Sequence, residues 1–277
     1  MRSLAARLAR FTRFRPAALG LATGLAGLST GQEVRDGRVR YEMSRATVIF
    51  DGGQFSAEQM GRFAVLADRG VADIDALLNA SEGAIARPGV TPPRILFVVS
   101  ASQGMSQTFR RRVMLPAERV RNESAPYLHE TTHALMPMRA ECLWLSEGFA
   151  SYVQSYVAEH IGGYDGIVFS RGGNANVDRL ARRHLRSPGG EGVLPYVGGA
   201  GEPPNLFENR RQVAEPLYVM SHSFVKYLVE RTSLDQVHRL ALSADVEAAA
   251  PRLIGRTIES WKAEWVANVM TPPAAAN

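Results

Sequence analysis

The sequence predicts an α+β fold, in which a small N-terminal mixed β-sheet with one long helix precedes a mainly helical part. Segments of strand character occur only up to residue 115, whereas apolar residues at helical spacing dominate the rest of the chain. Of the 277 residues, 45% are hydrophobic and 21% are charged, as in globular proteins with a sizeable core. We expect one domain over residues 31–277, β-rich over 31–120 and helical over 121–277, with a cleft between the two parts.

The individual elements follow from apolar periodicity and from the residues that interrupt it. Strands are expected over residues 38–41, 47–50, 94–99 and 111–115. Residues 57–79 follow Ser56, a predicted N-cap, and their helical periodicity predicts one long helix. Further helices are expected over residues 125–136, 146–160, 177–184, 216–231, 234–242 and 257–270. The remainder of residues 162–210, rich in Gly, Pro and Arg, reads as loop.

The net charge of +5 comes entirely from the N-terminus. Residues 1–30 contain no acid, and their five positive charges come from Arg2, Arg7, Arg10, Arg13 and Arg15. Acidic and basic side chains therefore balance over residues 31–277, which gives this part of the chain no overall electrostatic reason to bind nucleic acid. The single cysteine, Cys142, excludes an internal disulfide bond.

Residues 1–30 have the order of a secretory signal peptide. A basic stretch precedes an apolar run over residues 17–28, which is followed by small residues. We therefore expect a periplasmic or secreted protein, and the alternative is a basic N-terminal arm on a cytoplasmic protein. The apolar run is short for a bilayer, and no other stretch predicts a membrane span.

The strongest chemical signal is the segment His129-Glu130-Thr131-Thr132-His133. Histidines four residues apart on a helix project from one side, so both imidazoles can bind one Zn²⁺ ion. Glu130 is not needed as a ligand and is suited to act as a general base that takes a proton from water. Apolar neighbours predict that this helix is buried, and a buried segment of this kind needs a metal or a dense hydrogen-bond network.

A second signal is Trp144-Leu145-Ser146-Glu147-Gly148. If Ser146 is the N-cap, Glu147 lies in the first turn of the next helix, where the helix dipole favours a carboxylate. Two helices joined by a short connection can place this carboxylate opposite His129 and His133. The resulting set of two histidines and one glutamate leaves a fourth zinc position for water.

Together, the two segments resemble the gluzincin zinc metallopeptidases, in particular the peptidase MA-like group, with the aminopeptidase N family as a more distant relative. The resemblance implies that His129, His133 and Glu147 bind zinc and that Glu130 is the catalytic base. It also implies that Tyr218, at the start of a later apolar helix, stabilises the oxyanion of the transition state. His222 lies one turn after Tyr218 and could reach the same site, or could be a structural histidine.

The sequence departs from the aminopeptidase branch in two respects. Only thirteen residues separate His133 from Glu147, which is shorter than in that branch. No Gly-x-Met-Glu-Asn segment is present to bind a substrate N-terminus. We therefore expect a zinc-dependent hydrolase of peptides or proteins, and the missing segment argues against aminopeptidase activity. The alternatives are a catalytically inactive zinc-binding scaffold or peptide-binding protein, and a helical domain without metal.

Overall fold

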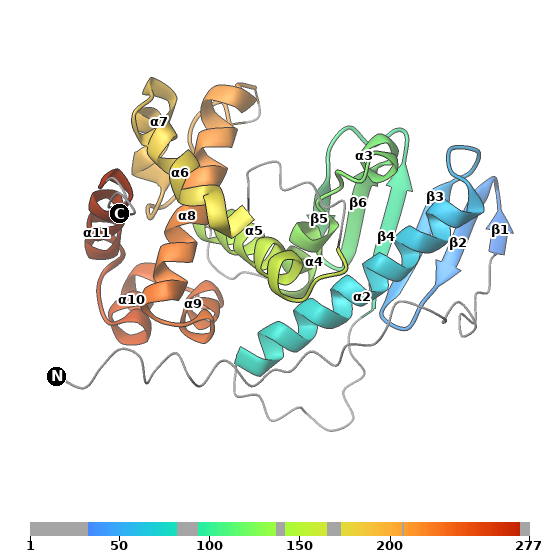
Figure 1. Ribbon diagram of the computed structural model, residues 1–277, viewed down its shortest axis with the longest axis horizontal. Coiled ribbons are helices and arrows are strands. Elements are labelled where there is room, and N and C mark those ends of the chain that lie inside the picture. The colour runs from blue at the N-terminus through green and yellow to red at the C-terminus, as the bar shows by residue number, and fades with distance from the viewer. Residues whose placement is uncertain (1–32, 82–93, 137–141, 165–172, 207, 272–277) are drawn as a thin grey trace, which may run out of the picture.

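The computed structural model of the protein describes residues 33–81, 94–136, 142–164, 173–206 and 208–271 (Figure 1). These residues form the α+β fold that the sequence predicts, with strands first and helices after them. The expected leader, residues 1–30, lies outside the described residues. None of the described helices is long and apolar enough to cross a membrane.

One mixed sheet contains six strands in the order β1-β2-β3-β4-β6-β5. The strands are β1 (Glu33–Arg35), β2 (Arg38–Glu42), β3 (Ala46–Asp51), β4 (Ile95–Ser100), β5 (Gln107–Phe109) and β6 (Arg112–Pro116). Strands β3, β4 and β6 are parallel, and the remaining pairs are antiparallel. The four predicted strands form within one residue of their expected ends. Strands β1 and β5 were not predicted, because three residues are too few to show alternation.

The long helix α2 (Ala57–Ser81) packs against the sheet (Figure 1). It begins with the capping box expected at Ser56, whose side chain accepts a hydrogen bond from the backbone N–H of Gln59. The Phe63 ring of α2 lies edge-on to Phe50 of the sheet, with ring centroids 6.0 Å apart, and to Tyr127, with centroids 5.4 Å apart. Because Tyr127 begins the helix of the first histidine motif, this aromatic cluster fixes that helix against the sheet.

The remaining described elements are helical. They are α3 (Ala117–Arg121), α4 (Tyr127–Leu135), α5 (Leu143–His160), α6 (Gly173–Leu185), α7 (Pro188–Val193), the 3-10 helix η1 (Leu194–Tyr196), the π-helix η2 (Arg210–Ala214), α8 (Glu215–Arg231), α9 (Leu234–Ala241), α10 (Val246–Ile254) and α11 (Ile258–Met270). Part of the remainder of 162–210, which was expected to be loop, is thus helical within the described residues. Helix α7 forms there because Ser187 caps it and Pro188 stands in its first turn. Helix α10, with an internal proline, was also not predicted.

Helices α5 and α8 pack against each other at the centre of the helical part (Figure 1). Trp144 of α5 contacts Phe224 of α8, with ring centroids 5.2 Å apart. Phe224 in turn contacts Trp265 of α11, with centroids 5.3 Å apart. Gly148 permits this approach, since a Cβ atom there would lie 2.5 Å from the backbone oxygen of Ser221. Gly148 follows Glu147 directly, so the same contact fixes the position of that carboxylate.

Gly148→Ala is expected to lower the free energy of unfolding by about 1–3 kcal/mol, because the new methyl group overlaps backbone of α8 and forces the helices apart. Gly61→Ala is a matched control in helix α2, where a Cβ atom meets nothing within 4 Å. That change is expected to be neutral or to stabilise by about 0.5–1 kcal/mol. Denaturant unfolding measures both, and equal effects would contradict the close packing of α5 on α8.

Candidate active site

The first motif forms helix α4, as the sequence predicts. The helix begins after Pro126 and buries Tyr127 and Leu128 in the core. His129 and His133 project from one side of the helix, with ring centroids 4.7 Å apart. Glu130 is also buried, with 6% of its surface exposed, although a buried carboxylate is costly without polar partners. This burial points to a specific use for the Glu130 carboxylate.

The second motif lies inside helix α5 and does not begin it. The N-cap is Cys142, so Glu147 stands in the second turn, and the expectation that Ser146 caps this helix is wrong. The helix begins earlier because Trp144 and Leu145 are fully part of the apolar core. The proposed contribution of the helix dipole to Glu147 therefore does not apply. Instead, Ser146 Oγ lies 3.3 Å from Nδ1 of His133.

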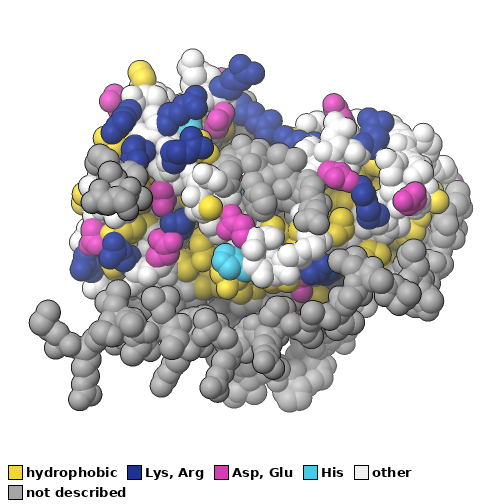
Figure 2. All heavy atoms as spheres, in the orientation of Figure 1, with side chains coloured by type: hydrophobic (Ala, Val, Ile, Leu, Met, Phe, Trp, Pro, Cys, Tyr) yellow, Lys and Arg dark blue, Asp and Glu magenta, His cyan; other side chains and the backbone are white. Residues whose placement is uncertain are grey.

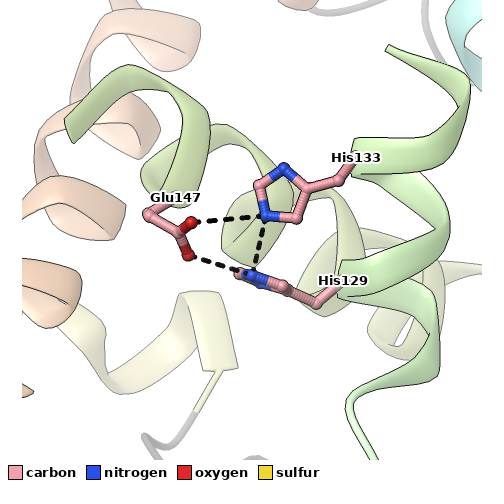
Figure 3. A group of neighbouring side chains, drawn as sticks. All are labelled: His129, His133 and Glu147. Atoms are coloured by element: carbon pink, nitrogen blue, oxygen red, sulfur yellow. Dashed lines mark hydrogen bonds and ion pairs between the residues drawn. The ribbon is translucent and has the colours of Figure 1, made fainter. Parts of the chain in front are cut away.

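The side chains of His129, His133 and Glu147 converge on a common point (Figure 3). Nε2 of His129 lies 3.1 Å from Nε2 of His133 and 3.1 Å from Oε2 of Glu147. Nε2 of His133 lies 3.5 Å from Oε1 of Glu147. Neighbouring ligand atoms around a tetrahedral zinc ion, with bonds of about 2.0–2.2 Å, lie roughly 3.3–3.6 Å apart. The triangle of donor atoms therefore fits one face of a zinc tetrahedron.

The other ring nitrogen of each histidine has a hydroxyl partner. Nδ1 of His133 lies 3.3 Å from Ser146 Oγ, and Nδ1 of His129 lies 3.3 Å from Ser151 Oγ. When each Nδ1–H donates to its serine, both Nε2 lone pairs point at the Glu147 carboxylate. Three electron-rich atoms then face one another, an arrangement that a cation stabilises. The donor set thus fits zinc in chemistry as well as in spacing.

The electrostatics of the site agree with ligand roles. Burial raises the pKa of the Glu147 carboxyl, but the hydrogen bonds and charges of the two imidazoles outweigh it and hold that pKa well below its usual range. Burial lowers the pKa of His133, but its hydrogen bond to Glu147 and the nearby carboxylates raise it above the usual value. A metal ligand must be deprotonated, so Glu147 is ready to bind a cation, whereas at His133 a cation competes with a proton.

Thr108 of the edge strand β5 holds the Glu130 carboxylate. Its hydroxyl oxygen lies 2.7 Å from Oε2 of Glu130 and 3.0 Å from the backbone oxygen of the same residue. Strand β5 packs against α4, so this contact fixes the orientation of Glu130 from outside its own helix. The carboxylate therefore has a defined position beside the two histidines.

The site opens into a cleft with a volume of about 810 Å³. His129, His133 and Glu147 line this cleft, together with Glu130 and Tyr218. Side chains of the three potential ligands are 14–17% exposed, so the site is mostly shielded but reachable from the cleft. Its lining comes from both β5 and the helices, which agrees with the expected cleft between the two parts of the fold.

His222 also lines the cleft, but its surroundings favour a structural role. It is 2% exposed, and its Nε2 lies 2.7 Å from Oδ1 of Asn174. Tyr218, one turn earlier on α8, is half-buried in the cleft wall. Of the two candidates for the oxyanion, Tyr218 thus has the more suitable place, and its role stays a prediction.

Sequence reasoning missed several residues that support the site. Ser151 contacts His129, and Oε1 of Gln154 accepts a hydrogen bond from the backbone N–H of His129, at 3.2 Å. One signal could have found Ser151: it follows Glu147 by four residues and so lies on the same face of the helix. Thr108 gave no comparable signal, because its short strand lies twenty-two residues from Glu130 in the sequence.

Comparisons with known proteins give little guidance. No family model matches the sequence, and a search of curated proteins found no significant match, so membership of the peptidase MA-like group stays a prediction. Two similar solved structures are a mutant two-domain M1 zinc metallopeptidase bound to L-arginine (TM-score 0.44, 16% identity) and a mutant M1 zinc metallopeptidase from Deinococcus radiodurans (TM-score 0.44, 15% identity). The alignments cover 84% and 89% of this chain, and 49% and 52% of those chains. The chain thus spans about half their length, and likeness at this level supports no functional argument.

Proposed function

We propose that the protein is a zinc-dependent hydrolase of peptide bonds, in which His129, His133 and Glu147 bind the metal and Glu130 is the general base. The observation that supports this most is the convergence of three ligand atoms within 4.8 Å of one another, next to a buried glutamate and in the wall of a large cleft. Zinc in such a site supplies Lewis acidity, which polarises a carbonyl group and acidifies water.

The protein groups provide the proton transfers and the positioning. Glu130 accepts a proton from the attacking water and returns it to the amine leaving group. The hydroxyl of Thr108 holds the Glu130 carboxylate in one orientation. Tyr218 is proposed to donate a hydrogen bond to the oxyanion that forms on the substrate. The cleft walls limit access of bulk water to these groups, since the ligand side chains are no more than 17% exposed.

The edge strand β5 is the proposed alignment surface for the substrate. The neighbouring strand β6 cannot serve in this way, because it lies inside the sheet between β4 and β5. Strand β5 has no strand partner on its outer side within the described residues, and its residues Gln107 and Thr108 line the cleft. An extended peptide added along β5 would therefore pass directly beside Glu130.

Zinc analysis and turnover test this function together. Protein purified without a histidine tag should hold about one equivalent of zinc, because three converging protein ligands bind the ion tightly. The zinc-loaded protein should cleave members of a broad peptide library, and protein stripped by a chelator should not until zinc is restored. Zinc without turnover would instead identify a catalytically inactive scaffold. The absence of tightly held zinc would exclude the metal site altogether.

Thr108→Val is expected to lower kcat for peptide hydrolysis about tenfold without changing zinc content, since it removes a hydrogen bond that positions the general base but keeps the side-chain shape. Thr108→Ser retains the hydroxyl and should restore most of the activity. Steady-state kinetics on one peptide compares the three proteins. Unchanged kcat in the Val variant would contradict this role of the hydroxyl, and equal losses in the Val and Ser variants would show that the threonine methyl group is needed as well.

A further inference from the structure

The charged residues that line the cleft are strongly unbalanced. Among the described residues that line it, the only acids are Glu130 and Glu147, and both belong to the candidate metal site. The bases that line it are Arg110, Arg111, Arg119 and Arg210. Acidic and basic residues balance over residues 31–277, so this excess is local to the cleft and is not a consequence of a basic protein. Charges of one sign around a concave site add their potentials and attract ligands of the opposite sign.

The arginines come from both sides of the cleft. Arg110 and Arg111 occupy the turn between β5 and β6, and Arg119 lies on α3, all in the sheet part. Arg210 begins η2, which leads into α8 in the helical part. On that side, Figure 2 shows further basic side chains in the region of α6 and α7. A substrate in the cleft would therefore meet positive charge from two directions.

None of the four cleft arginines has a carboxylate partner among the described residues. Arginines elsewhere often do: Arg45 lies 3.1 Å from Asp75, and Arg94 lies 2.8 Å from Glu42. The guanidinium carbon of Arg110 lies over the ring of Phe109, 5.5 Å from the ring centroid. The guanidinium groups in the cleft are thus available to bind carboxylates from outside the protein, which they can contact through two parallel hydrogen bonds.

We propose that the cleft selects acidic peptides, with Asp or Glu side chains within about three residues of the cleaved bond. This inference rests on the proposed function for the position of that bond. A peptide added along β5 passes Thr108, beside Glu130, and reaches the turn at Arg110 and Arg111 only two or three residues later, at about 3.3 Å per residue. Arg119 and Arg210 bind further carboxylates from the other cleft positions.

Three fluorescein-labelled peptides of equal length test the selectivity, with Glu, Gln or Lys at the same positions on both sides of a central Ala-Leu bond. Binding is measured on zinc-loaded Glu130→Gln protein, and cleavage on the wild type. The Glu peptide is expected to bind about tenfold more tightly than the Gln peptide, as for a few partly exposed ion pairs, and the Lys peptide most weakly. Added NaCl should reduce the preference by screening. Equal binding of the Glu and Gln peptides would overturn the proposal.

Charge-matched variants then identify the groups responsible. One variant combines changes inside the cleft, Arg111→Gln, Arg119→Gln and Arg210→Gln. The control combines changes at exposed neighbours that do not line it, Arg112→Gln, Arg121→Gln and Arg211→Gln. Both lose the same net charge, so only a local effect distinguishes them. The cleft variant should lose the preference for the Glu peptide, and the control should keep it. Loss in both, or in neither, would contradict the assignment, and the single variants Arg111→Gln and Arg210→Gln repeat the comparison with smaller changes.

The two proposals can fail separately. If the Gln peptide were cleaved as fast as the Glu peptide, the proposed hydrolase activity would be supported and the proposed selectivity for acidic peptides would be contradicted. If the Glu peptide were bound selectively but the wild type cleaved none of the peptides, the selectivity would be supported and the proposed hydrolase activity would be contradicted.

Discussion

Glu130→Gln is expected to lower kcat for peptide hydrolysis by about 10²- to 10⁴-fold, the usual contribution of a general base. The amide has nearly the shape of the carboxylate and can still accept the hydrogen bond from Thr108, so the fold should persist. The amide cannot accept a proton from water, however, and the reaction loses its base. Steady-state kinetics on a cleaved library peptide measures the loss, and elemental analysis measures the zinc.

The zinc content of this variant separates a catalytic role from a structural one. Glu130 is outside the group of three potential ligands, so zinc should stay at about one equivalent. Glu118→Gln provides a control, because Glu118 is an exposed acid of α3 outside the cleft. Full activity in Glu130→Gln would exclude the proposed base. Loss of zinc together with activity would show that this residue supports the metal site instead.

Glu147→Ala is expected to remove most of the bound zinc and, with it, all measurable hydrolysis. Loss of a hydrogen-bonding partner of a metal ligand weakens binding about 10- to 100-fold, and loss of a ligand itself should exceed that range. In this protein Glu147 supplies the only carboxylate that contacts both histidines within the described residues. Zinc titration of the metal-free protein against a competing chelator measures the change in affinity.

Ser151→Ala is expected to weaken zinc binding less than Glu147→Ala does. Ser151 contacts Nδ1 of His129 and is not among the potential ligands, so its loss should weaken zinc binding by only about tenfold. If Ser151→Ala weakened zinc binding more than Glu147→Ala, the metal would be held by a different set of atoms. Full zinc affinity in Glu147→Ala would lead to the same conclusion.

Much of this site was predictable because its chemistry depends on spacing within one helix. Residues four apart on a helix share a face whatever surrounds them, so the sequence alone places His129 beside His133. The same local rule identified the long helix after Ser56, which begins with the predicted capping box. The four predicted strands were recognisable because each is long enough to show its apolar pattern.

Contacts between elements were not predictable in this way, because they depend on how the elements pack together and not on sequence spacing. Ser146 was expected to cap a helix, but packing of Trp144 and Leu145 extends α5 past it and turns Ser146 into a partner of His133. The sequence likewise could not place Arg210 in the same cleft as Arg111, which is 99 residues earlier. The sequence by itself determined which groups could perform the chemistry. The tertiary structure decided which of them face one another, because only the packing of α5 and β5 against α4 brings their side chains to one point.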